Sequence, residues 1–308
     1  MRDQPTTIRP ESASAMRWAI GLAPLIALPP LTFLLCRGEL PAWATMWAVA
    51  FVIFLGCKWL TITFHVPRPK ELPRLMAYLL GWPGLDLEAF LHGEVRDDDQ
   101  PTMGEWALAA VKLGIGLVFV YGLARLVPKE QGYWRGWLGM IGIVMTLHFG
   151  SFHLLSCFWR SRGVRALPLM NAPLLARSPS EFWGRRWNRA FRDLTHRFLF
   201  GPLARPWGAS KAAFIGFAFS GVIHDAVISI PAGGGYGGPT LYFLGQALAI
   251  RFERSRVWAR HVKPRPALAH LLTLAMLALP APLLFHPPFV HRIILPFLEA
   301  IGGLTHAR

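Results

Sequence analysis

Residues 42–64 read AWATMWAVAFVIFLGCKWLTITF, a stretch in which Lys58 is the one charged residue. As an α-helix this stretch would be about 35 Å long, enough to cross the hydrocarbon core of a bilayer. Other stretches have the same character, which gives about seven spans, namely 18–36, 42–64, 105–127, 134–158, 210–231, 238–252 and 267–289. The sequence therefore predicts an all-α fold, a multi-pass transmembrane helical bundle. We expect residues 1–308 to form a single membrane-embedded domain.

The composition of the 308 residues agrees with a membrane protein. Hydrophobic residues make up 53% of the chain and charged residues only 16%, whereas a soluble domain carries about a quarter charged residues. Too few charged side chains remain to cover a soluble core. The three cysteines, Cys36, Cys57 and Cys157, lie in apolar stretches without CxxC spacing. We therefore predict neither a disulfide framework nor a metal site.

The charges predict an orientation in the membrane. The chain has 32 Lys and Arg against 17 Asp and Glu, a net charge of +15. With a cytoplasmic N-terminus, alternating spans put 24 of the 32 basic residues on the cytoplasmic side and five on the other, as the positive-inside rule expects. This distribution explains the positive charge without a nucleic-acid partner, and in a bacterium it would place the chain in the inner membrane. No small-residue cleavage site follows the first span, so we expect it to be retained.

Two cytoplasmic segments are expected to lie in the membrane interface. Residues 70–92 form two apolar pieces around a Gly81-Trp82-Pro83-Gly84 turn. The second segment, 159–209, contains Ser178-Pro179-Ser180-Glu181, a typical helix start. From Phe182 to Phe198, apolar residues recur at helical spacing and the basic residues lie mostly off that face. The pattern predicts one basic amphipathic helix at the interface.

Several histidines fall inside the predicted spans. His224 lies in the fifth, directly before Asp225, and an ionisable pair within hydrocarbon suggests a functional site. The two side chains point about 100° apart on a helix, so they are not automatically a dyad, and a polar contact between helices is the alternative. His148 and His153 are five residues apart on the fourth span, roughly 140° around the helix, a poor geometry for one metal. Packing or a polar path explains them better.

Two of these stretches resemble a known family. FWGRRWN at 182–188 looks like the signature of the wax synthase branch of the membrane-bound O-acyltransferase family, and SGVIHD at 220–225 is similar to its second signature. GCKW at 56–59 and WPGLD at 82–86 also resemble that branch. Asp225 stands where the family more often has Glu, which leaves the role of this acid open.

The resemblance implies an O-acyltransferase that moves a fatty acyl group from acyl-CoA to the hydroxyl of a long-chain alcohol. His224 would be the general base and Asn188 would hold the hydroxyl or the thioester oxygen. Burial in lipid favours the neutral imidazole that a base requires. The residues that would bind CoA are Arg185, Arg186, Arg189 and Trp187, although anionic lipid headgroups are an equal alternative for each arginine. Acyl-CoA would be a cosubstrate, with no permanently bound cofactor.

Other functions remain open. Diacylglycerol or a sterol could replace the long-chain alcohol without a change in chemistry. A transporter could use His148, His153, His224 and Asp225 as a polar path. The sequence disfavours a transporter, because the spans hold few ionisable residues and no repeat relates the two halves of the chain. A purely structural membrane protein would leave the Trp- and Arg-rich segment unexplained.

Overall fold

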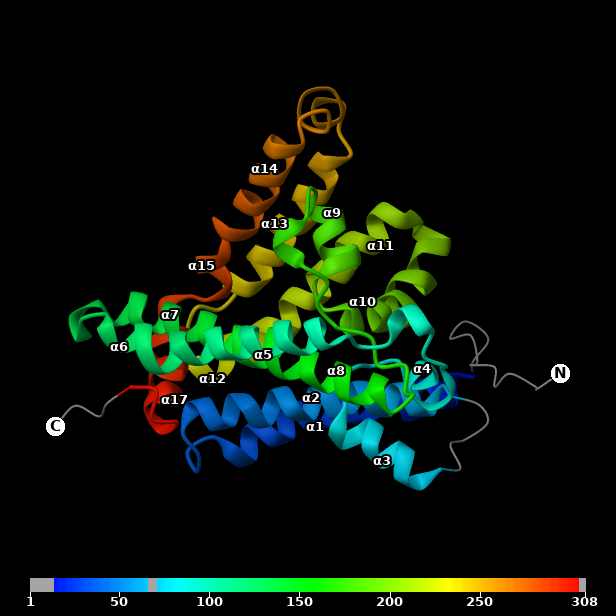
Figure 1. Cartoon of the computed structure of the whole chain (residues 1–308), viewed down its shortest axis with the longest axis horizontal. Coiled ribbons are helices and arrows are strands. Elements are labelled where there is room, and N and C mark those ends of the chain that lie inside the picture. Colours follow the sequence, from blue (N-terminus) through cyan, green and yellow to red (C-terminus); the bar gives the residue numbers. More distant parts are fainter. Residues whose placement is uncertain (1–13, 66–70, 305–308) are drawn as a thin grey trace.

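The computed structural model describes residues 14–65 and 71–304, which form helices and connecting turns (Figure 1). Six helical segments of this part are long and apolar enough to cross a membrane: Ala15–Cys36, Ala42–Thr63, Asp97–Leu126, Lys129–Ser161, Arg189–Ala232 and Pro266–Leu284. The predicted all-α, multi-pass membrane class is confirmed. The basic N-terminal residues used in the orientation argument, Arg2 and Arg9, lie outside the described residues.

The elements have the following bounds. The α-helices are α1 Ala15–Cys36, α2 Ala42–Thr63, α3 Leu72–Gly81, α4 Leu87–His92, α5 Met103–Val118, α6 Ala124–Leu126, α7 Gly132–Val144, α8 Phe152–Ser161, α9 Pro179–Glu181, α10 Arg189–Thr195, α11 Gly201–His224, α12 Ile230–Ala232, α13 Gly238–Glu253, α14 Pro266–Ala278, α15 Ala281–Leu284, α16 Pro287–Phe289 and α17 Leu295–Ala300. The π-helical turns are η3 Phe119–Leu123, η5 Met145–Ser151, η7 Phe182–Arg186, η8 His196–Phe200, η9 Asp225–Ser229, η10 Trp258–Val262 and η11 Val290–Ile294. The 3-10 turns are η2 Asp97–Asp99, η4 Lys129–Gln131 and η6 Pro173–Leu175.

The number of spans differs from the expected seven. Residues 238–252 do form a helix, α13, but its 16 residues extend only about 24 Å. This is shorter than a hydrocarbon core of about 30 Å. A short turn returns the chain from α12 to α13, which packs along α11 (Figure 1). The described residues therefore contain six full-length spans and one shorter helix packed beside them.

The predicted amphipathic helix after Ser178 is broken in the middle. The helical turns that start at α9 end at Arg186, Trp187 is extended, and Asn188 is left-handed with φ 39° and ψ 64°. The chain becomes helical again at Arg189. Our prediction of one continuous helix from Phe182 to Phe198 was wrong, because backbone bonds from this break go to residues 169–171 instead of along a helix.

The interfacial segment 70–92 forms two short helices, α3 and α4, on either side of its Gly/Pro turn, as expected where it is described. Lys58 of α2 holds this turn in place. The Lys58 side chain is fully buried, and its Nζ donates to the backbone oxygens of Tyr78 (2.8 Å), Trp82 (2.7 Å) and Gly84 (2.6 Å). Nζ also lies 3.4 Å from the centre of the Tyr78 ring. The GCKW and WPGLD motifs thus meet in space.

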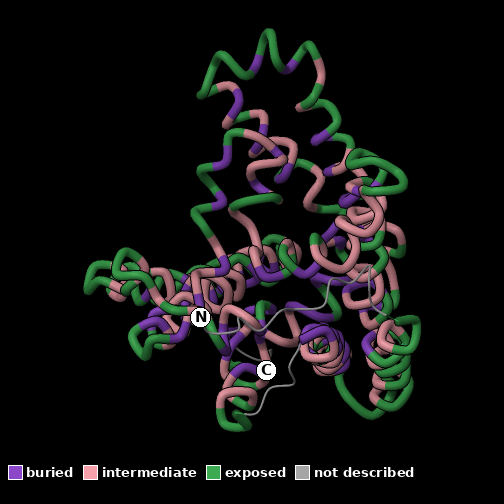
Figure 2. Tube along the Cα trace, turned by 90° about the vertical axis from the view of Figure 1, so that its right-hand side faces the viewer, coloured by how far each residue is buried: buried purple, intermediate pink, exposed green. Residues whose placement is uncertain are grey.

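Packing follows the pattern expected in a bilayer. α1 and α2 lie side by side, α5, α7 and α8 pack together and lie above them in this view, and α13 and α14 extend away together (Figure 1). Buried residues gather where these helices cross, and exposed residues follow their outer sides (Figure 2). Many of the exposed side chains are large and apolar, including Ile26 of α1, Val118 of α5 and Leu271 of α14. Such an apolar exterior suits contact with lipid and not with water. The chain is an integral membrane protein.

Candidate active site

His224 ends α11, where the α-helix passes into the π-helical turn η9. Its Nδ1 lies 2.7 Å from the backbone oxygen of Ser220, one turn earlier. A carbonyl oxygen can only accept a hydrogen bond, so Nδ1 carries the ring proton of the neutral imidazole. Nε2 then has a free lone pair, as a general base requires. The imidazole packs against the Phe243 ring of α13, with ring centres 4.5 Å apart.

Asp225 is not directed at its neighbour His224. Its Oδ1 accepts hydrogen bonds from the Ser229 hydroxyl and the Gly237 N–H, both at 2.8 Å. Its Oδ2 accepts from the N–H of Thr240 at 3.0 Å and from the Thr240 hydroxyl. The carboxylate therefore sits at the N-terminus of α13, where the helix dipole favours a negative charge. Asp225 ties α13 to α11, and α13 carries the Phe243 ring that packs against His224.

Asn188 occupies the break in the FWGRRWN segment. A non-glycine residue with positive φ is uncommon and costs free energy, so the surrounding contacts must hold it. The Asn188 Oδ1 accepts from the Phe191 N–H at 3.4 Å and caps α10, while its own N–H points to the Met170 sulfur at 3.3 Å. Beside it, the Arg189 N–H donates to the Leu169 oxygen at 2.9 Å. The turn is thus built by side chain and backbone together.

The arginines of this segment differ in their environment. Arg186 pairs with Glu181 at 2.7 Å and donates to the backbone oxygens of Asn171 and Ala172, both at 3.2 Å. These bonds join the break to the preceding loop. Arg185 is exposed and Arg189 half-buried, and the described residues give neither guanidinium an ion-pair partner. The structure therefore leaves Arg185 and Arg189 available to an anion, while Arg186 already has protein partners.

A continuous arc of aromatic rings joins two spans through this segment. Consecutive ring centres along the arc are separated by 6.5, 5.5, 5.0, 5.6 and 4.5 Å. In order, the rings belong to His148, Trp187, Phe182, Trp183, Phe243 and His224. Trp183 is fixed further by a hydrogen bond of 3.3 Å from its indole N–H to Gln246. We predicted that Trp187 would contact CoA. In the structure its ring packs between His148 and Phe182.

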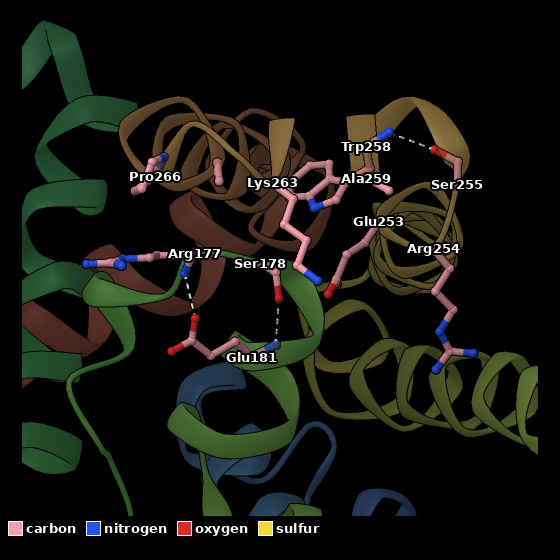
Figure 3. A pocket seen from close by; sticks show the side chains of 11 residues that line it. Arg177, Ser178, Glu181, Glu253, Arg254, Ser255, Trp258, Ala259, Lys263 and Pro266 are labelled. Carbon is pink, nitrogen blue, oxygen red and sulfur yellow. Dashed lines mark hydrogen bonds between the residues drawn. The ribbon is translucent and has the colours of Figure 1, made fainter. Parts of the chain in front are cut away.

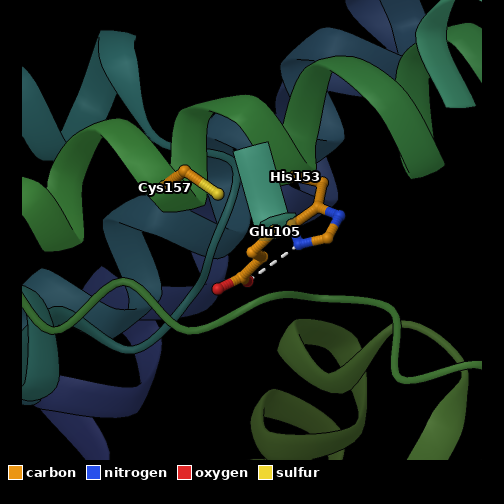
Figure 4. A group of neighbouring side chains, drawn as sticks. All are labelled: Glu105, His153 and Cys157. Carbon is orange, nitrogen blue, oxygen red and sulfur yellow. Dashed lines mark hydrogen bonds and ion pairs between the residues drawn. The ribbon is translucent and has the colours of Figure 1, made fainter. Parts of the chain in front are cut away.

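His148 is the histidine of this arc to which the sequence assigned no role in acyl transfer. Helical spacing grouped it with His153, but the two side chains have different surroundings. His153 Nε2 lies 2.9 Å from Glu105 Oε1, and Cys157 is nearby (Figure 4). Arg160 contacts both the Glu105 carboxylate and the Cys157 sulfur, so its guanidinium already supplies the positive charge there. This group is an ion network that ties α5 to α8, and it does not suggest a metal centre.

A polar cavity of about 390 Å³ lies beside the start of the same segment (Figure 3). Arg177, Ser178 and Glu181 line one wall, and the chain from Glu253 to Lys263 lines another. Glu253 accepts from the N–H and hydroxyl of Ser180 at 2.8 and 2.6 Å, which fastens α13 to α9. The sequence could not predict this cavity, because residues more than seventy positions apart form it.

Gly184 is the glycine of the FWGRRWN segment, and a residue without a Cβ lets other groups approach the backbone closely. No atom of the described chain lies within 4 Å of the position that a Cβ would take there. Its backbone oxygen accepts a hydrogen bond of 3.0 Å from Arg192. The space beside Gly184 is open, so no other part of the described protein explains the glycine.

Comparison with known proteins bears on this part of the chain. Residues 166–245 match the sequence model of the membrane bound O-acyl transferase family. A probable long-chain-alcohol O-fatty-acyltransferase 9 of Arabidopsis thaliana is 30% identical over 136 residues, 40% of each chain. A long-chain-alcohol O-fatty-acyltransferase of Simmondsia chinensis is 32% identical over 71 residues, 20% of each chain. The chain thus aligns with less than half the length of these relatives.

The matched residues contain the broken segment, the His224 helix and most of the arc. Both motifs that suggested the family lie within 166–245, and both named relatives carry long-chain-alcohol acyl transfer in their names. The resemblance predicted from the two motifs is therefore confirmed: residues 166–245 are similar to the membrane-bound O-acyltransferase family, and the two relatives are long-chain-alcohol O-fatty-acyltransferases by name.

Proposed function

We propose that this protein transfers a fatty acyl group from acyl-CoA to the hydroxyl of a long-chain alcohol and so makes a wax ester. The observation that carries the proposal is the fixed imidazole of His224. Its Nδ1–H is held by the Ser220 oxygen, which leaves Nε2 as the basic nitrogen inside an apolar span. A histidine fixed in this way can act repeatedly as a base without having to reorient.

The reaction then needs one proton acceptor and one oxyanion donor. His224 Nε2 removes the alcohol proton as the alcohol oxygen attacks the thioester carbonyl carbon. The C–O bond forms and the carbonyl oxygen becomes an oxyanion. When the oxyanion collapses, the C–S bond breaks and Nε2 returns the proton to the leaving CoA sulfur. The products are the ester and free CoA.

Asn188 is proposed to stabilise the oxyanion. Its Oδ1 caps α10, so its Nδ2 group is the part of the side chain left to donate to a substrate oxygen. Arg185 and Arg189 would bind the phosphates of CoA, since Arg186 is already paired with Glu181. Trp187 and Arg186 would act by shaping the Asn188 turn. A cytoplasmic N-terminus would put this basic segment on the side where acyl-CoA is found.

Two other proposals can be compared with this one. Diacylglycerol or a sterol would use the same base and the same donor, and only the acceptor cavity would differ. A transporter would need polar groups free to exchange partners along a path. Asp225, the acidic residue of that path, is held by several hydrogen bonds. This observation favours the acyltransferase.

The test is an acyl-transfer assay on membranes free of other acyltransferases, with labelled acyl-CoA and a panel of long-chain alcohols, diacylglycerol and sterols. We expect ester product with long-chain alcohols and a fall of about 10²–10⁴-fold in His224→Gln, which keeps polarity but cannot act as the base. His291→Gln, at an exposed histidine, is the matched control and should stay active. A His224→Gln enzyme with near-normal kcat would remove His224 from the mechanism.

A further inference from the structure

His148 has an environment that packing alone does not explain. It lies on the π-helical turn η5 inside the span Lys129–Ser161. Its ring stacks on Trp187, with ring centres 6.5 Å apart and planes 16° apart, and meets Phe152 at 5.3 Å. Its Nδ1 is buried, and no residue of the described chain gives it a hydrogen bond. A phenylalanine would make the same ring contacts without burying an unpaired nitrogen, which costs free energy.

The position of the ring suggests what the nitrogen is for. π-helical turns within α-helices are frequent at functional sites. Trp187, on which His148 stacks, directly precedes Asn188, and the aromatic arc connects His148 to His224. His148 and His224 are the only rings of that arc with basic nitrogens. The arc therefore connects His148 to the neighbourhood of both candidate catalytic residues, and the Nδ1 of His148 is a buried polar atom there without a hydrogen-bond partner in the described chain.

We infer that His148 binds the hydroxyl group of the acceptor alcohol, an inference that rests on the proposed function. With its ring proton on Nδ1, His148 donates to the alcohol oxygen and leaves the alcohol's own proton to His224 Nε2. The ring also lies within a span between aromatic side chains, which suits a lipid alcohol better than the charged part of CoA.

The decisive variant is His148→Phe, which keeps the stacking on Trp187 and removes the nitrogen. We expect the KM for a long-chain alcohol to rise about tenfold, the factor of one ordinary hydrogen bond, while the KM for acyl-CoA stays the same. The melting temperature should be unchanged or higher, since an unpaired buried nitrogen is gone. Phe149→Leu is the matched control, because Phe149 also contacts Trp187, at 6.2 Å, but offers no polar atom. It should leave the alcohol KM unchanged.

A binding measurement tests the inference without turnover. Hexadecanol should raise the melting temperature of the purified wild-type protein more than hexadecane, which lacks the hydroxyl. In His148→Phe the difference between the two compounds should become several-fold smaller, because only His224 is left to contact the hydroxyl, and His148→Asn, which places a polar atom near the Nδ1 position, should regain part of the lost difference. Equal shifts in the wild type, or an unchanged preference for hexadecanol in His148→Phe, would overturn the inference. Wild-type membranes without ester product would refute the proposed function itself.

Discussion

Replacing Lys58 by methionine should loosen the whole segment from α3 to α4. The three backbone oxygens of Tyr78, Trp82 and Gly84 lie within 2.8 Å of Nζ, and three N–H donors are available only on a protonated ammonium group. Methionine fills a similar volume but donates nothing, so these oxygens would stay buried and unpaired. Each such group costs about 1–3 kcal/mol.

Part of that loss is offset, because methionine has no charge and the free-energy cost of burying the Lys58 ammonium group away from water is removed. Three such oxygens would together cost about 3–9 kcal/mol, and with this offset we expect a net loss of about 3–5 kcal/mol in the free energy of unfolding. Loss of the contact between Nζ and the Tyr78 ring, 3.4 Å away, acts in the same direction. We expect this loss in the free energy of unfolding to exceed that of a conservative substitution at another buried position of α2.

Thermal unfolding in detergent, combined with limited proteolysis, measures this effect. The melting temperature of Lys58→Met should fall by about 5–15 °C, taking a few degrees per kcal/mol for a chain of this size. Protease sites within residues 71–92 should become accessible before those elsewhere. Cys57→Ala, at the adjacent buried position, is the control and should cost much less. A Lys58→Met protein with wild-type melting and an equally protected segment would refute the reasoning.

Three further predictions concern orientation, the basic residues and the strained turn. Single cysteines at Ser180 and Gly234, in a background without other cysteines, should react with a membrane-impermeant reagent from opposite sides, and labelling of both from one side would contradict the topology. Arg185→Ala should raise the KM for acyl-CoA several-fold in a salt-dependent way. Arg186→Ala should instead lower the melting temperature, because it removes the ion pair with Glu181. Equal behaviour of the two variants would argue against separate roles. Asn188→Gly should fold with nearly unchanged stability, because glycine accepts φ 39° and is a tolerable helix cap. Its kcat should nevertheless drop at least about tenfold. Retained turnover would show that Asn188 only shapes the turn.

The apolar spans and the helix start at Ser178 could be predicted from sequence, because each depends on residues close together along the chain. The break at Trp187 and Asn188 could not, since helical spacing continues on both sides of a two-residue interruption. The hydrogen-bond partners of Lys58 could not be predicted either, because they are backbone oxygens, which every residue has. Asp225 was ambiguous for the same reason: two of its donors are the N–H groups of Gly237 and Thr240, which come close only once α13 folds back.

His224 and Asn188 are candidates from their motifs, whereas the ring contacts between their neighbourhoods could not be predicted. The arc passes through rings on four separate parts of the chain, and Phe243 has no distinguishing context in the sequence. His148 was grouped with His153 by spacing, although its contacts belong to the motif segment. Residue types within a motif predict chemistry well, whereas contacts between distant segments need the structure.

The bonds between Asp225 and the start of α13 have a consequence for how the protein is made. A helix of 16 residues is too short to enter a bilayer readily by itself, whereas α11 and the residues before it leave the ribosome first. The Asp225 carboxylate is therefore already in the membrane, as a hydrogen-bond acceptor, when the N–H groups at the start of α13 are synthesised. We expect insertion of α13 to depend on this earlier anchor, so arresting translation at successive lengths should find α13 in the membrane only when Asp225 is intact. Phe243 would reach His224 in that same step, so the surroundings of this candidate catalytic histidine would assemble late in biogenesis.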